Sequence, residues 1–322
     1  MEGIVTLTLN PTIDGAAEAE RVAPIRKVRT WGERYDPGGG GINASRVIRE
    51  LGGDSLAIYL SGGSTGPILD GLIRSAGLRS RRVPIAGHTR ISYTVHEQTT
   101  GLEYRFVPQG PAVEPAEWEA ALDALESLPC AYLLASGSLP NGVPADFYAR
   151  VGETAARKGA KLVLDTSGAA LKEALKRRVH LVKPSLGELE DLMGVRLPGA
   201  AEQEAAAAAL VRNGAAEMVA LTLGRDGALL ATPAGAWRLD GIPVKTQSAV
   251  GAGDSFLGAM TLALATGKSA LEAFTLGAAA GTAAVMTMGT ELCRRADVER
   301  LYAQIQAGGG PRPVSPPPAA SA

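Results

Sequence analysis

The residues best suited to chemistry stand in a glycine-rich turn, Val250–Phe256, with the sequence VGAGDSF. Gly251 and Gly253 allow neighbouring backbone amides to converge, and a helix beginning here adds the positive end of its dipole. Such a turn can hold an anion, for example a phosphoryl group in transfer. Asp254 could accept a proton from an attacking hydroxyl, but an aspartate at this position is also a common helix cap.

Three further glycine-containing segments border predicted strands or helices. PGGGGIN at 37–43 has four consecutive glycines, which cost conformational entropy and are best explained by close approach of the backbone to a ligand. The chain has neither the dinucleotide-binding pattern G-x-G-x-x-G after its first strand nor a Walker A loop. SGSLP at 136–140 stands where open α/β sheets bind ligands, whereas TLGRDG at 222–227, taken alone, predicts a simple turn.

Short apolar runs alternate with alanine-rich helical patterns, which predicts an α/β fold with a mostly parallel sheet covered on both faces. The predicted strands are Ile4–Leu9, Leu56–Leu60, Tyr132–Ala135, Lys161–Asp165, His180–Lys183 and Met218–Thr222. The predicted helices are Ile42–Leu51, Gly66–Ala76, Pro115–Leu128, Pro144–Lys158, Ser185–Met193, Ala200–Asn213, Gly251–Thr266, Ala270–Met288 and Ala296–Ala307. Gly15–Tyr35 and Thr89–Val107 interrupt this alternation and predict a small second β-layer, the latter as a hairpin.

The 322 residues include 32 Lys and Arg against 33 Asp and Glu, a formal net charge of −1. Without a basic excess, neither nucleic acid nor a membrane surface is an expected partner. The N-terminal segment lacks the pattern of a signal peptide, and no stretch is apolar enough to span a bilayer. The two cysteines are isolated, so neither a disulfide framework nor a zinc site is predicted. We expect a cytoplasmic protein whose residues 308–322, rich in Pro, Gly and Ser, form a disordered tail.

Together the motifs resemble the PfkB branch of the ribokinase family of sugar kinases, and the resemblance covers all but the tail. The matching segments are TLTLNPTID, PGGGGINASR, ASGSLPNG, LVKPSLGELE and QSAVGAGDSF, in the order of the family. Within the family the sequence is most similar to the minor bacterial 6-phosphofructokinases. The 1-phosphofructokinases and tagatose-6-phosphate kinases usually have lysine where this chain has Gly40.

The resemblance implies a ribokinase-like three-layer α/β/α sandwich with a small, discontinuous β-sheet lid. The kinase domain would consist of residues 1–11, 36–87 and 110–307, and the lid of residues 12–35 and 88–109. An exposed lid sheet has unpaired edges and an apolar face. Because the lids of relatives clasp each other, we expect a homodimer formed through the lid.

The implied reaction is ATP-dependent phosphorylation of fructose 6-phosphate at the C1 hydroxyl, which gives fructose 1,6-bisphosphate in glycolysis. Asp254 would be the general base, and the amides of Gly251, Ala252 and Gly253 would form the anion hole. The positions that correspond to substrate contacts are Asp14, Gly38, Gly39, Asn43, Arg90, Arg105, Ser138 and Lys27. The two arginines suit a 6-phosphate because a guanidinium donates two charge-assisted hydrogen bonds; solvated strand arginines are the alternative.

The implied cofactors are ATP and Mg²⁺, together with K⁺. The positions that correspond to the nucleotide site are Lys183, Ser185, Glu188, Thr222, Gly224, Gly227 and Thr246. Glu188 would position Mg²⁺ through water, although Ser185 replaces the usual asparagine of this motif. The positions that correspond to the potassium site are Ser248, Val250, Ala284, Thr287 and Gly289, followed by Glu291 in place of an arginine.

Two other functions remain open at this point. The chain could be a 1-phosphofructokinase or a tagatose-6-phosphate kinase, because the substrates are closely similar; only the stereochemistry of one hydroxyl separates tagatose 6-phosphate from fructose 6-phosphate. From another class, it could be a sugar-phosphate-binding regulator without turnover, which the serine at 185 leaves open and the intact Asp254, Lys183 and Glu188 argue against. An NAD-dependent oxidoreductase would require the absent dinucleotide pattern.

Overall fold

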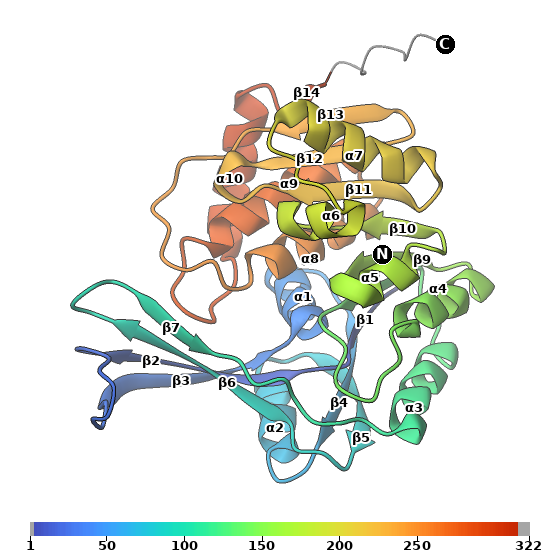
Figure 1. The fold of residues 1–322 in the computed structure, drawn as a ribbon. Helices are drawn as coiled ribbons and strands as arrows, with labels where there is room; N and C mark the ends of the chain where they lie inside the picture. The colour runs from blue at the N-terminus through green and yellow to red at the C-terminus, as the bar shows by residue number, and fades with distance from the viewer. Residues whose placement is uncertain (1–2, 315–322) are drawn as a thin grey trace.

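The structure, a computed structural model, describes residues 3–314 and has a large twisted sheet between two layers of helices, with a small second sheet beside it (Figure 1). The large sheet contains, in spatial order, β14 (Arg312–Pro313), β13 (Gly235–Leu239), β12 (Ala228–Thr232), β11 (Ala216–Thr222), β10 (Val179–Val182), β9 (Lys161–Asp165), β8 (Tyr132–Ser136), β1 (Ile4–Thr8), β4 (Leu56–Gly62) and β5 (Arg79–Ile85). In this spatial order, seven neighbouring strands are parallel to one another: β11, β10, β9, β8, β1, β4 and β5. β12, β13 and β14 continue the sheet with antiparallel pairing.

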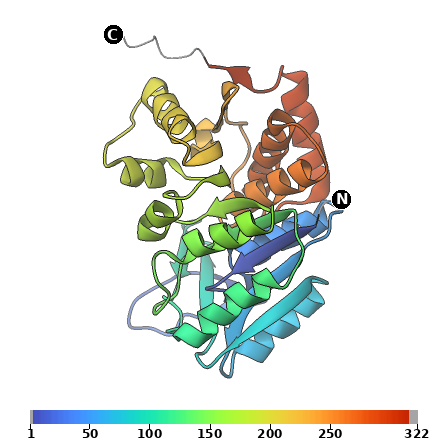
Figure 2. The same ribbon diagram turned by 90° about the vertical axis from the view of Figure 1, so that its right-hand side faces the viewer.

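Helices cover both faces of this sheet (Figure 2). One layer contains α3 (Pro115–Glu126), α4 (Phe147–Arg157), α5 (Gly168–Ala174), α6 (Leu186–Met193) and α7 (Ala200–Arg212). The other contains α1 (Gly40–Glu50), α2 (Gly66–Ser75), α8 (Ala252–Ala265), α9 (Ala270–Ala284) and α10 (Arg295–Ala307). Each face of the sheet contributes to its own apolar core, so the expected three-layer α/β/α sandwich is confirmed. Within residues 3–314, no helix is both long and apolar enough to cross a membrane.

All six predicted strands are present in the parallel part of the sheet, but β5 and the antiparallel strands were missed. β5 lies at the edge of the sheet and exposes most of its RSRRVPI sequence, so it lacks the apolar run of a buried strand. The structure also differs from the predicted tail, because residues 312–313 form β14 against β13 and Val314 donates to the carbonyl of Ala236. The rest of that tail, 315–322, lies outside the described residues.

The second sheet contains β3 (Thr30–Gly38), β2 (Thr12–Ala19), β6 (Arg90–Glu97) and β7 (Glu103–Phe106), and is called the lid below. It extends from one side of the main body (Figure 1). β2 pairs antiparallel with β3 and parallel with β6, and β6 and β7 form the hairpin that the sequence predicted. β3 runs three residues beyond the expected lid boundary at 35, directly into the glycine run before α1.

Close packing of α1 against α8 joins the two glycine motifs of the sequence. α8 is apolar on every side and buried along most of its length. A side chain at Gly258 would stand 2.9 Å from the carbonyl oxygen of Ala44, so a glycine is needed for this approach. As a result Asn43, next to Ala44, lies beside Asp254, one turn before Gly258.

Candidate active site

The candidate site lies at the edge of the large sheet where the parallel strands end. Asp165 is the last residue of β9, Lys183 follows β10, and Gly137 follows β8. The chain leaves β1 for the lid at Asn10, on the same edge. β1 lies between β4 and β8: the chain adds β4 and β5 on one side of β1, and then β8 to β11 on its other side. Open α/β sheets bind ligands at the point where the strand order reverses in this way.

Asp254 stands in the first turn of α8 and is only partly accessible to solvent. Its Oδ2 accepts a hydrogen bond of 2.9 Å from Nδ2 of Asn43. Burial raises the pKa of Asp254 to about 6, and the charge of Asp165 adds to this rise, while the bond from Asn43 opposes it. A carboxylate with such a pKa is ionised at neutral pH and is a far better proton acceptor than an exposed aspartate.

Arg46 of α1 connects Asn43 with the lid. It donates to Oδ1 of Asn43 at 3.3 Å and to the carbonyl of Pro37 at 3.2 Å, and it pairs with Asp36 at 3.2 Å. These bonds fix the amide of Asn43, so that its NH₂ group points to Asp254. Asp14 lies in the same electrostatic field: burial raises its pKa to about 6, against the opposing charges of Arg46 and Arg90.

On the other side of Asp254, Lys183 is buried and its Nζ lies 3.2 Å from Oδ2 of Asp165. Burial alone would lower the pKa of Lys183, but the carboxylates of Asp165, Glu188 and Asp254 together raise it, so the ammonium group is charged. A buried cation next to the start of α8 suits the phosphate chain of a nucleotide. A side chain at Gly253 would stand 3.2 Å from this Nζ, so the glycine keeps the approach to the ammonium group open.

Three glycines of the run that leads into α1 are also required, two by neighbouring atoms and one by its backbone conformation. A side chain at Gly38 would collide with the carboxylate of Asp14. One at Gly40 would collide with the hydroxyl of Ser136 and stand 3.1 Å from Oδ1 of Asp254. Gly39, whose φ is 106°, has a backbone conformation that other residues rarely adopt. The glycine run therefore leaves room beside both carboxylates.

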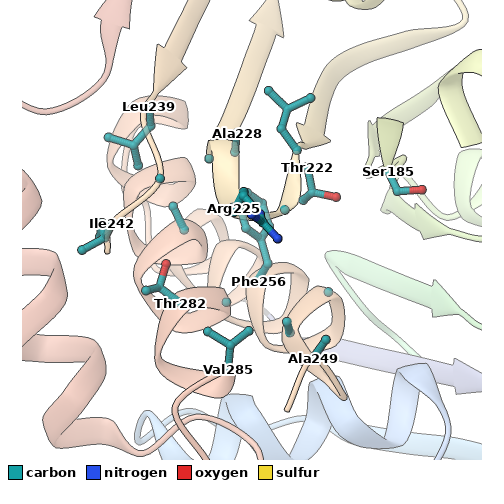
Figure 3. A pocket seen from close by; sticks show the side chains of 18 of the residues that line it. Ser185, Thr222, Arg225, Ala228, Leu239, Ile242, Ala249, Phe256, Thr282 and Val285 are labelled. Atoms are coloured by element: carbon teal, nitrogen blue, oxygen red, sulfur yellow. The ribbon is translucent and has the colours of Figure 1, made fainter. Parts of the chain in front are cut away.

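A cavity of about 900 Å³ opens between β12, α8 and α9 (Figure 3), within the size range of ligand sites. Ser185 and Thr222 lie at one side of it, and Phe256 and Val285 form an apolar wall (Figure 3). The predicted nucleotide and anion-hole residues that line it are Ser185, Thr222, Gly224, Gly227, Thr246, Ala252 and Gly253. An apolar cleft that ends at a helix N-terminus fits a planar base followed by phosphates.

Ser185 and Glu188 form a capping box at the start of α6. Oε2 of Glu188 accepts from the amide and the hydroxyl of Ser185, at 2.7 and 2.9 Å, and the serine hydroxyl accepts from the amide of Glu188. Glu188 also acts electrostatically on Asp165 and Lys183. The described residues contain no cluster of three or more ligands typical of a tightly held metal. The carboxylates of Asp165 and Glu188 fit an Mg²⁺ ion that nucleotide phosphates and water would mainly hold.

The predicted sugar-phosphate residues are only partly brought together. Arg90 donates to the carbonyls of Asn10 (2.8 Å) and Pro108 (2.9 Å), and more weakly to that of Pro11, so it joins the two chain segments that enter and leave the lid. Ser138 accepts a bond of 3.2 Å from Asn10. Lys27, in the loop between β2 and β3, and Arg105, on β7, are exposed on the lid.

The predicted potassium positions fall on the loop before α8 and on the end of α9 with the loop that follows it, and these two segments are in contact. The amides of Gln247 and Ser248 donate to the carbonyl of Val285. The hydroxyl of Thr287 donates to the carbonyls of Ala284 (2.8 Å) and Glu291 (3.0 Å). Val250 is at the start of the Gly251 turn, whereas Gly289 lies next to Ala16 and Arg34 of the lid.

The structure places three residues in the site that the motifs did not single out: Asp165, Arg46 and Asn10. Asp165 could have been found, because it is the last residue of a predicted strand. Asn10 and Arg46 stand within the quoted motifs TLTLNPTID and PGGGGINASR, but their roles were not predicted because they depend on partners far away in the sequence. Asn10 is buried, donates to Gln109 at 2.9 Å as well as to Ser138, and its Oδ1 has no partner among the described residues.

The family model described as "pfkB family carbohydrate kinase" matches residues 8–297. The chain belongs to this family. An ATP-dependent 6-phosphofructokinase isozyme 2 of Mycobacterium tuberculosis is 45% identical over 93% of this chain and 88% of its own length. The protein of the same name from Escherichia coli is 38% identical over 95% of this chain and 99% of its own length.

Among solved structures, phosphofructokinase-2 from Escherichia coli in complex with potassium is similar with a TM-score of 0.92 and 37% identity, over 95% of this chain and 100% of that chain. Its complex with fructose-6-phosphate gives a TM-score of 0.90 and 36% identity over the same shares. The ribokinase-like fold is thereby confirmed, and the pfkB chain is an ATP-dependent sugar-phosphate kinase.

Proposed function

We propose that this pfkB kinase phosphorylates fructose 6-phosphate at its C1 hydroxyl with ATP and releases fructose 1,6-bisphosphate. The observation that carries the proposal is the position of the α8 N-terminus. Ala252 and Gly253 line the nucleotide-sized cavity, while Asp254, the next residue, is bonded to Asn43 on the opposite side. Phosphoryl donor and hydroxyl acceptor would meet at this one turn.

In this mechanism Asp254 takes the proton of the C1 hydroxyl as the oxygen attacks the γ-phosphorus in line; the bond between the γ-phosphorus and the β–γ bridging oxygen breaks, and ADP is the leaving group. Asn43 holds Oδ2 of the carboxylate, which leaves Oδ1 to face Gly40 and the open space of the glycine run. The amides of Gly251, Ala252 and Gly253 receive the negative charge that develops on the phosphoryl oxygens, assisted by the helix dipole.

Lys183 would hold the phosphate chain at the mouth of the cavity, and bound Mg²⁺ would shield the charge of the nucleotide phosphates. Asp165 and Glu188 fit as partners of the waters around that ion. We assign the potassium site to the two segments at Ser248–Val250 and Ala284–Gly289, which contact each other beside the Gly251 turn. A similar structure was solved in complex with potassium, which supports a role for this ion in the present enzyme.

Among the acceptors, fructose 6-phosphate is favoured over fructose 1-phosphate and tagatose 6-phosphate by Gly40. A lysine at this position would have to displace Ser136 and would approach Oδ1 of Asp254. The relatives at 38–45% identity carry the name 6-phosphofructokinase, and one of the similar structures holds fructose-6-phosphate. We further infer a cytoplasmic enzyme, because its substrates are cytoplasmic metabolites.

We also propose a homodimer formed through the lid. Large apolar side chains on the lid are exposed; they are Ile25, Trp31, Tyr35, Ile91, Phe106 and Val107. Apolar side chains gathered on one exposed sheet are typical of an interface between protein chains.

The decisive experiment is an ADP-release assay with fructose 6-phosphate, fructose 1-phosphate and tagatose 6-phosphate as acceptors. We expect the highest kcat/KM for fructose 6-phosphate, with the product phosphorylated at C1. A higher value for either other sugar would overturn the substrate assignment. Tight binding of all three without ADP release would instead support a regulator.

A further inference from the structure

Arg34 of the lid strand β3 forms hydrogen bonds with the loop that follows α9. Its Nη1 donates to Oε1 of Glu291 at 2.9 Å, and its Nη2 donates to the carbonyl of Met288 at 3.0 Å. The guanidinium thus bonds both a side chain and the backbone of loop 288–291. Glu291 uses its second oxygen, Oε2, for Arg294, at 2.8 Å.

Two more contacts connect the lid with the same region. Asp36, two residues after Arg34, accepts a hydrogen bond from the hydroxyl of Thr290. Glu103 of β7 accepts from the hydroxyl of Ser248 at 3.3 Å, on the loop before α8. The lid therefore contacts both loops that lie beside the Gly251 turn.

These contacts continue to the reacting groups along two short routes. Asp36 pairs with Arg46, which bonds Asn43 and through it Asp254. On the other route Leu292, the residue after Glu291, packs on Gly251, since a side chain at Gly251 would collide with Cδ2 of this leucine. Motion of loop 288–292 would thus reach both the base and the anion-hole turn.

We propose that Arg34 is a positioning residue that couples the lid to the anion-hole turn: a sugar phosphate bound against the lid orders loop 288–292 through the Arg34–Glu291 pair. This inference rests on the proposed function. The pair is suited to coupling because its side chains are 38% and 36% exposed. A half-exposed ion pair forms and breaks at little cost, unlike a buried one, so it can follow the lid.

The test is amide hydrogen exchange of the full-length protein with and without fructose 6-phosphate, in the parent and in Arg34→Ala. In the parent we expect the sugar phosphate to slow exchange both in the lid (90–106) and in the loop (286–293). In Arg34→Ala the slowing in the lid should persist, whereas that in the loop should be lost. We also expect kcat to fall about two- to five-fold, the range for a half-exposed pair.

Three variants make the result specific. Arg294→Ala removes the other arginine on Glu291 without touching the lid, and it should behave as the parent. Arg34→Lys, which can reach Glu291 but not form both bonds at once, should recover part of the slowing. Glu291→Ala added to Arg34→Ala should cost no more than Arg34→Ala alone, because Glu291 contributes to the coupling through its bond with Arg34.

Two outcomes contradict the proposal in distinguishable ways. If fructose 6-phosphate slows exchange nowhere in the parent, the proposed substrate is wrong, and the proposed coupling, which depends on that substrate, is wrong as well. If it slows exchange equally in the loop of the parent and of Arg34→Ala, the substrate stands and only the coupling is wrong.

Discussion

Replacing Asp254 by asparagine tests the mechanism and the electrostatics of the site in one variant. Asparagine has the same shape and can still bond Asn43, but it cannot take the hydroxyl proton. Proton removal by a positioned side chain contributes about 10²–10⁴-fold, so kcat should fall by that order. Nucleotide affinity should stay within a few-fold of the parent, because Lys183 and the cavity are unchanged.

The same variant should be more stable than the parent at alkaline pH. The pKa of Asp254 is raised from 3.8 to about 6 by burial, so the folded protein opposes ionisation of this group. Below about pH 3 the carboxyl is protonated in both the folded and the unfolded state, so it does not lower the free energy of unfolding. As pH rises from there to about 6, the unfolded state ionises first, and the free energy of unfolding decreases. A shift of this size corresponds to at most about 3 kcal/mol at pH 8. The Asp254→Asn variant avoids this cost, so it should unfold at a temperature a few degrees higher at about pH 8, with a smaller gain at about pH 5.

The assay combines steady-state turnover, nucleotide titration and melting curves at both pH values. In the parent, kcat/KM should decrease as pH falls through about 6, because the base becomes protonated. Turnover of the variant within a few-fold of the parent would remove Asp254 from the mechanism. A loss of stability at the alkaline pH, combined with near-normal turnover, would show that the aspartate is a helix cap.

Three further predictions concern the other parts of the site. Arg90→Ala should lower kcat/KM for fructose 6-phosphate about 10- to 100-fold through lost charge-assisted bonds, and an equal loss with unphosphorylated fructose would show that Arg90 only ties the lid to the body. Lys183→Met should destabilise the fold by about 3–5 kcal/mol in urea unfolding, because it leaves Asp165 buried without its partner, and Asp165→Asn added to it should restore part of the loss. Dilution should lower specific activity as the lid dimer separates, and a monomer with full activity in analytical ultracentrifugation would contradict the dimer.

The fold class and the principal motifs could be predicted from the sequence because both depend on local order along the chain. Alternation of apolar strands with alanine-rich helices identifies an α/β sandwich, and a glycine turn before a helix predicts an anion site, whatever its distant partners are. β5 was missed because it is an exposed edge strand, which is held by pairing with β4 and lacks the apolar run of a buried strand.

The arrangement around Asp254 depended on tertiary structure alone. Its pKa is set by burial and by Asp165, far earlier in the chain, and its orientation by Asn43, which close packing of α1 on α8 brings within 2.9 Å. Arg90 shows the same limit, since the sequence indicates a phosphate ligand but not the carbonyls at both crossings into the lid that it bonds. A sequence specifies which groups can react; desolvation, charge and distance between remote segments exist only once the chain has folded.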